Sequence, residues 1–134
     1  FPGRMDEVIT GAAINNKSEW VNLVNTPSDQ KFGSCYGREV DIAAPGLFIS
    51  TTRNNGKYTD IFCGTSAATA IVSAVAAILV AINPALTATD VRDCLLSTAD
   101  AVGSEAGLEH LNRVGHGKIN AYKAIEKAIE TVFA

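Results

Sequence analysis

The sequence has few charged residues and no tract of basic side chains. Charged residues make up 19% of the 134 residues, and the 11 basic and 14 acidic side chains, which leave a net charge of −3, are scattered along the chain. Nucleic-acid-binding domains carry a basic patch or stripe, so nucleic acid is not an expected partner. The mean hydropathy of +0.15 and the 47% of hydrophobic residues instead indicate large buried surfaces, in a chain of one domain's length.

Cysteine is scarce, and two further kinds of motif are missing. Cys35, Cys63 and Cys94 form an odd set without a Cys-x-x-Cys pair, so neither a disulfide framework nor a zinc site is indicated. No GxGxxG or GxxxxGK[ST] loop is present, which argues against a nucleotide-binding domain. The chain begins at Phe1 without a visible signal peptide, and we expect that a segment precedes it.

The longest apolar stretch covers residues 66–82. It contains alanine and aliphatic residues without any charged side chain, and Asn83-Pro84 ends it. This pattern predicts a helix that is apolar on every face and lies in the centre of the protein. A membrane span is the alternative, but about 17 residues is the short limit for crossing a bilayer and Thr69 and Ser73 are polar, so no membrane is expected as a partner.

Strands are predicted before this helix and more helices after it. Apolar and β-branched runs predict strands at residues 8–15, 39–46, 47–52 and 58–62, an edge strand at 20–24 and an Asn-Gly turn within 53–57. Thr87 and Asp90 predict a capping box that opens a second helix. A third helix is predicted at residues 118–133, with these side chains buried: Ile119, Tyr122, Ile125, Ile129 and Val132. The pattern indicates an α/β fold, a mostly parallel sheet flanked by helices, with the site at the carboxyl ends of the strands.

Ser66 follows Gly64 and Thr65 where a strand meets the long helix. A serine in the first helical turn lies beside free backbone N–H groups and the positive end of the helix dipole, an environment that suits the stabilisation of an oxyanion. Glycine lets the backbone approach a bound chain closely. Serine and threonine are also the preferred N-cap residues, so a helix cap explains the tripeptide alone without any reaction.

Five blocks follow one another in the sequence. They are VITGAAIN (8–15), GREVDIAAPGLFIST (37–51), GTS with its alanine-rich helix (64–82), TATDVRDCLLSTAD (87–100) and GHGKINA (115–121). In this order and spacing they resemble the C-terminal part of the catalytic domain of the subtilisin-like serine peptidases, the subtilases. The resemblance covers essentially the whole chain and implies a subtilisin-like fold, with residues 1–134 as the C-terminal portion of a single catalytic domain whose N-terminal part is missing here.

The resemblance implies that Ser66 is the nucleophile of an Asp/His/Ser triad that hydrolyses polypeptides through an acyl-enzyme. In the family the aspartate, the histidine and an oxyanion-binding asparagine precede the first block, so they are expected from an N-terminal segment or chain. His110 and His116 follow the serine, in the wrong order, and are expected at the surface. The chain is thus expected to be a piece of a nicked peptidase or a fragment; the alternative is a non-catalytic binding or scaffold module.

The resemblance also implies substrate contacts around the serine. They are assigned to Phe62, Cys63, Gly64, Thr65 and Ala67, with Thr65 and the backbone N–H of Ser66 at the oxyanion hole. Cys63 is otherwise explained as a buried apolar residue. Ala67 replaces the family's methionine, which removes an oxidisable thioether. Gly3 falls where the family forms one wall of the pocket for the residue before the scissile bond.

A structural cation site is implied near the second predicted strand. Asp41 and Glu39 match a place where many subtilases bind a cation, and the carbonyls of Gly3, Met5 and Val8 would complete an oxygen cage of the kind that calcium requires. Solvated carboxylates at a strand end are the alternative. Catalysis itself is expected to need no cofactor, so this calcium would be structural. A secreted or cell-surface location is implied by the resemblance alone.

Overall fold

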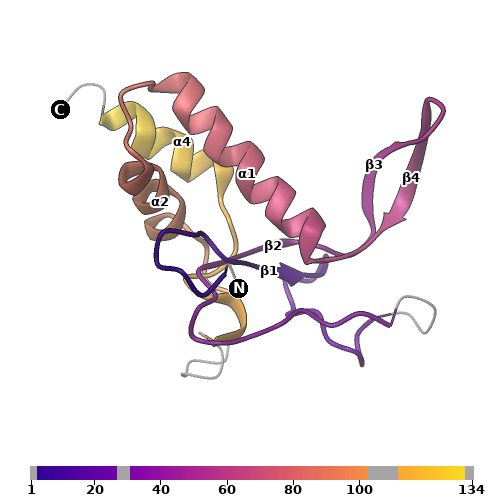
Figure 1. Cartoon of the computed structure of the whole chain (residues 1–134). Coiled ribbons are helices and arrows are strands. Elements are labelled where there is room, and N and C mark those ends of the chain that lie inside the picture. The colour runs from indigo at the N-terminus through magenta and orange to yellow at the C-terminus, as the bar shows by residue number, and fades with distance from the viewer. Residues whose placement is uncertain (1–2, 27–30, 103–111, 132–134) are drawn as a thin grey trace.

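The computed structural model describes residues 3–26, 31–102 and 112–131, and Figure 1 shows their arrangement. Strands come first and helices follow, as the sequence predicts. The elements are β1 (Gly11–Ile14), β2 (Ile42–Pro45), β3 (Ile49–Arg53), β4 (Lys57–Phe62), α1 (Thr65–Ile82), α2 (Ala88–Ser97) and α4 (Ala121–Glu130).

A short parallel pair, β1 and β2, lies in the centre of the fold. Gly11 lies opposite Ile42 and Ile14 lies opposite Pro45. The alanines of both strands are fully buried, and their small side chains let α1 pack closely on this pair. Lys118 adds an isolated parallel bridge to Ala43. The predicted parallel sheet is present, but within the described residues it is small.

The second sheet is the antiparallel hairpin of β3 and β4, which projects from the rest of the chain in Figure 1. Arg53 pairs with Lys57 across the turn. Asn55 and Gly56 have φ values of 62° and 68°, a left-handed conformation that asparagine and glycine accept most readily. The Asn-Gly turn and both flanking strands are therefore confirmed.

Helix α1 begins one residue before its predicted start and ends at the predicted residue, with Asn83 as its C-cap. It packs on β1, β2, α2 and α4 through one side only, which buries Ala67, Ala68, Val72, Val75 and Leu79. Within the described residues α1 does not reach the predicted central position, because Ile78 and Val80 are each 44% exposed. Length and composition alone would also let α1 cross a membrane, whereas these contacts place one face of it against the folded chain.

The capping box of α2 is confirmed. The Thr87 hydroxyl accepts a hydrogen bond from the backbone N–H of Asp90 at 3.2 Å, and the Asp90 carboxylate accepts one from the backbone N–H of Thr87 at 2.8 Å. The carboxylate also accepts a hydrogen bond from the Thr87 hydroxyl. These bonds, led by the one from the Thr87 hydroxyl, hold the pKa of Asp90 below its usual value.

Helix α4 differs from its prediction in its start and in its buried face. It begins at Ala121, behind an Asn120 cap, and its buried residues are Ala124 and Ala128. Tyr122 and Ile129 are 70% and 40% exposed, so the prediction that they are buried is wrong. The alanine face lets α4 approach α1 and α2 closely, whereas a face of larger side chains would hold the helices apart. Ile119 and Ile125 are partly buried against the core, and Val132 lies outside the described residues.

Three of the predicted strands are clearly shorter than expected. The first begins at Gly11 rather than at residue 8, and the strand predicted at 39–46 is observed at Ile42–Pro45. The predicted edge strand at residues 20–24 is reduced to one antiparallel bridge between Trp20 and Ile14. The side chains of Asn22 and Asn25 accept hydrogen bonds from backbone N–H groups there and fold the segment into turns.

Candidate active site

The backbone at the start of α1 is anchored to the carboxyl ends of β1 and β2. Gly64 donates its N–H to the carbonyl of Gly46 at 2.8 Å, and Gly46 donates its N–H to the carbonyl of Ile14 at 3.0 Å. Gly46 directly follows β2, and Ile14 is the last residue of β1. The helix therefore begins at the sheet edge where the sequence predicts a site.

Ser66 is exposed and does not cap the helix. The N-cap is Gly64, with φ 145° and ψ 158°, and the helix has no side-chain cap hydrogen bond. Ser66 is the second helical residue, and among the described residues its hydroxyl has no hydrogen-bond partner. The interpretation of Ser66 as an ordinary helix cap is therefore not supported, and the hydroxyl is accessible to other groups.

The electrostatic setting of Ser66 favours negative charge. The backbone N–H groups of the first helical turn lack partners within their helix, and the helix dipole is positive at this end. The first turn of α1 contains no acidic side chain that would offset this potential. An oxyanion that formed beside Ser66 would therefore be stabilised.

Cys63 fixes the base of the hairpin next to Ser66. Its thiol accepts a hydrogen bond from the backbone N–H of Phe48 at 3.4 Å and donates one to the carbonyl of Ile61 at 3.5 Å. Phe48 has φ 55°, a strained conformation for a bulky residue, so this contact helps to hold it. Cys63 is partly buried, so it is less enclosed than the buried apolar residue that was the alternative to a substrate contact.

The other predicted contact residues divide between surface and core. Phe62 is 43% exposed, whereas Ala67 is 4% exposed and points into the core. Thr65 and Gly3 line the same cavity of about 760 Å³, and the assignment of Gly3 to a substrate pocket stays a prediction. Other residues around this cavity include Gly11, Cys35, Tyr36 and Thr69.

His116 lies at the opposite end of β2 from Ser66. It is exposed, and its backbone N–H donates a hydrogen bond to the carbonyl of Asp41, just before β2, at 2.8 Å. A strand rises about 3.3 Å per residue, so the five steps from Asp41 to Gly46 separate the two ends by roughly 16 Å. His116 is a surface residue, as predicted, and does not adjoin Ser66. His110 lies outside the described residues.

The five residues predicted to bind a cation do come together. Gly3, Met5, Val8, Glu39 and Asp41 line one cavity of about 580 Å³, which three arginines also line: Arg4, Arg38 and Arg92. Arg92 was not foreseen from the sequence. Its only signal was a basic residue between Asp90 and Asp93 at the acidic start of α2.

Arginine and backbone N–H groups already bind the two carboxylates of this cavity. Asp41 forms an ion pair with Arg92 and accepts a hydrogen bond from the N–H of Thr10 at 2.7 Å. Glu39 lies 3.6 Å from the Nε of Arg4 and 3.5 Å from that of Arg38. The Glu39 carboxylate accepts a hydrogen bond from its own backbone N–H, and this bond is the main cause that holds the pKa of Glu39 below its usual value. The positive charges of Arg4 and Arg38 lower the pKa further. In this arrangement both Asp41 oxygens and one Glu39 oxygen already have positively charged or N–H partners, with which a cation would compete; cation binding here stays a prediction.

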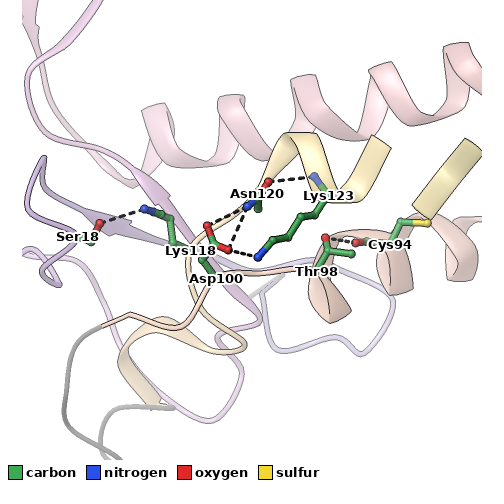
Figure 2. A network of polar contacts seen from close by, with 7 residues as sticks. All are labelled: Ser18, Cys94, Thr98, Asp100, Lys118, Asn120 and Lys123. Atoms are coloured by element: carbon green, nitrogen blue, oxygen red, sulfur yellow. Dashed lines mark hydrogen bonds and ion pairs between the residues drawn. The ribbon is translucent and has the colours of Figure 1, made fainter. Parts of the chain in front are cut away.

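A separate polar network joins the segment that follows α2 to the start of α4 (Figure 2). The Asp100 carboxylate accepts hydrogen bonds from Nδ2 of Asn120 at 2.9 Å and from Nζ of Lys123 at 2.7 Å. The Lys123 bond, then the Asn120 bond, holds the pKa of Asp100 below its usual value. Asn120 also accepts a hydrogen bond from the Lys123 N–H at 3.0 Å and so caps α4. This network stabilises the helix junction.

Comparisons with known proteins agree on one family. The model of the subtilase family matches residues 1–117. One subunit of the subtilase cytotoxin from Escherichia coli is 44% identical over 69% of this chain and 26% of its own length. The cell wall-associated protease of Bacillus subtilis is 36% identical over 90% of this chain and 17% of its own length. This chain thus spans about a quarter or less of these two relatives.

Solved structures are similar over nearly the whole chain. A structure of the subtilase cytotoxin SubAB assembly has a TM-score of 0.74 at 35% identity, covering 94% of this chain and 38% of that one. The prenylagaramide maturation protease PagA has a TM-score of 0.71 at 28% identity, covering 95% of this chain and 44% of that one. The predicted subtilisin-like fold, present here in part, is therefore confirmed.

Proposed function

Because this chain belongs to the subtilase family, we propose that it forms the part of a serine endopeptidase that carries the nucleophile, Ser66. The observation that carries the proposal is the placement of Ser66. Its exposed hydroxyl has no partner among the described residues and stands in the first turn of a helix anchored at the carboxyl ends of β1 and β2. A helix cap does not explain this position, whereas a nucleophile requires such access.

In the proposed reaction the Ser66 oxygen attacks the carbonyl carbon of a peptide bond in a polypeptide substrate. An imidazole takes the hydroxyl proton and then gives it to the leaving amine, and water hydrolyses the acyl-enzyme. The backbone N–H of Ser66, assisted by Thr65, donates to the oxyanion. Loss of one such donor typically costs about 10²–10³ in kcat. This chemistry needs no metal ion or cofactor.

The remaining catalytic groups are proposed to come from an N-terminal segment or chain. It would supply the aspartate, the histidine and the oxyanion-binding asparagine. The exposed side of α1 supports this proposal, since Ile78 and Val80 are each 44% exposed and Ile82 is 39% exposed. An apolar face of this kind is expected to be covered in the working protein. The partial coverage of each relative's length agrees with a longer protein.

A non-catalytic subtilase-like binding or scaffold module remains the second candidate. It would keep the same core while the intact protein lacked the aspartate and histidine. The two candidates differ in one chemical property, which is the reactivity of the Ser66 hydroxyl. An unactivated serine does not react with a fluorophosphonate at a useful rate, whereas a serine paired with an imidazole does.

The test is covalent labelling of the intact protein, with its N-terminal segment or partner chain, by a fluorophosphonate probe. Mass spectrometry should locate the label on Ser66. Ser66→Ala should abolish labelling, and Ser73→Ala, a change at an exposed serine of the same helix, should leave it intact. A correctly folded intact protein that stays unlabelled at Ser66 would reject the peptidase and favour the scaffold module.

A further inference from the structure

Arg92 joins three separate parts of the fold. It lies on α2, and its Nη1 donates a hydrogen bond to the carbonyl of Val8 at 3.2 Å while its Nη2 pairs with the carboxylate of Asp41. Val8 belongs to the segment before β1, and Asp41 directly precedes β2. The Arg92 and Asp41 side chains are only 29% and 15% exposed, so solvent screens this ion pair incompletely.

The oxygens around Arg92 already have donors. The second Asp41 oxygen accepts the Thr10 N–H at 2.7 Å, and the Gly3 carbonyl accepts the Thr10 hydroxyl at 2.8 Å. The Met5 carbonyl accepts the Val8 N–H at 3.0 Å. The Oε1 of Glu39 is paired with Arg4 and Arg38. The two Asp41 oxygens, one Glu39 oxygen and the carbonyls of Gly3, Met5 and Val8 therefore already have positively charged or N–H or O–H partners in the protein.

We propose that the guanidinium of Arg92 takes over the structural task of a bound cation at this place. A guanidinium carries a permanent positive charge and several N–H donors in a rigid fork. One guanidinium can therefore neutralise the Asp41 carboxylate and donate a hydrogen bond to the Val8 carbonyl at the same time. A divalent ion would have to compete with Arg92 for both oxygens and would lie close to Arg4 and Arg38. The segment before β1 is therefore held in place without calcium.

The segment that Arg92 holds also borders the cavity beside Thr65. Gly3, Arg4, Val8 and Glu39 line both this cavity and the one that Arg92 lines. A loss of Arg92 would thus loosen a wall next to the candidate active site. The proposal about Arg92 itself concerns local stability and does not depend on whether the protein is a peptidase.

The test is hydrogen–deuterium exchange of the peptide covering residues 3–10 in the intact protein, with calcium ions or with a chelator. This local readout is unaffected by calcium bound elsewhere. In the wild type, calcium should leave exchange unchanged. In Arg92→Gln, exchange in chelator should be about tenfold faster or more, as expected for the loss of hydrogen bonds to a charged group, and calcium should partly restore protection. Arg53→Gln, at an exposed arginine of β3, should behave as the wild type.

Two results would overturn the proposal. One is calcium-dependent protection of residues 3–10 in the wild type that Asp41→Asn removes, which would show that an ion binds here beside Arg92. The other is an Arg92→Gln variant whose exchange in chelator equals that of the wild type. Where Arg92→Gln does not fold, Arg92→Lys replaces it, since lysine keeps the charge but cannot reach both oxygens with a rigid fork.

Discussion

Gly64 donates its backbone N–H to the carbonyl of Gly46 at 2.8 Å, and this bond fixes where α1 begins. Gly46 has no room for a side chain, because a Cβ there would lie 2.6 Å from the Cβ of Ala13 and 2.9 Å from the carbonyl oxygen of Gly64. The contact between a loop after β2 and a loop after β4 therefore depends on glycine. It positions the backbone two residues before Ser66.

Gly46→Ala should move the start of α1 and destabilise the protein. The added methyl group must displace Ala13 or Gly64, and overpacking of this kind costs about 1–3 kcal/mol. We expect a lower midpoint in urea unfolding together with slower fluorophosphonate labelling of Ser66. Gly33→Ala is the control, because a Cβ there would meet its neighbours at an ordinary 3.8 Å. An unchanged midpoint and labelling rate in Gly46→Ala would contradict the positioning role of this contact.

The Asp100 network should contribute stability that depends on pH. The bonds from Lys123 and Asn120 lower the folded-state pKa of Asp100 from its ordinary value of 3.8, so the carboxylate is favoured in the folded protein. This contribution is fully present above the ordinary value and is lost as the pH falls through the lower folded pKa. Asp100→Asn should therefore lower the melting temperature near neutral pH, and the deficit should shrink in acid.

Thermal unfolding of wild type and Asp100→Asn across the acid range measures this difference. Asp60→Asn changes an exposed carboxylate on β4 and should show no comparable loss at neutral pH. The idea fails if the deficit of Asp100→Asn stays constant down to strongly acidic pH, because the stabilisation would then not come from the ionised carboxylate.

The labelling of Ser66 should resist peroxide. Ala67 cannot be oxidised, and the one methionine of this sequence is Met5, which lines the arginine cavity instead. Peroxide should therefore oxidise the exposed Met5 while the rate of fluorophosphonate labelling persists. Mass spectrometry of both sites in one treated sample checks this. The contrary result is labelling that is lost as Met5 is oxidised and is retained in Met5→Leu. That result would show that Met5, and not the residue at position 67, decides the sensitivity to peroxide.

Features with local causes could be predicted from the sequence. The capping box of Thr87 and Asp90, the Asn-Gly hairpin turn and the extent of α1 each depend on neighbours within a few residues. Ser66 could be singled out because its motif is continuous with the helix. The family resemblance then predicted the fold, and it predicted that Gly3, Met5, Val8 and Glu39 lie close to Asp41.

Features set by distant contacts could not be predicted. Arg92 reaches Val8 across 84 positions of the chain and Asp41 across 51, and no local pattern encodes such a meeting. The apolar spacing of α4 favoured burial of Tyr122, but the close approach of α1 selects the alanine face instead. Helix α1 is another example. Its composition is apolar on every face, so the sequence does not indicate which face packs against the rest of this chain.

The uncovered side of α1 leads to the last prediction, that residues 1–134 produced alone associate or precipitate. Ile78, Val80 and Ile82 expose an apolar surface that water does not favour, and a second copy is the nearest cover for it. Light scattering should report dimers or larger species. Ile78→Ser with Val80→Ser should shift the chain towards monomer, whereas Tyr58→Ser, at an exposed aromatic of the hairpin, should not. A stable, monodisperse wild-type monomer would mean that this face needs no partner, and the proposed docking of an N-terminal segment there would lose its support.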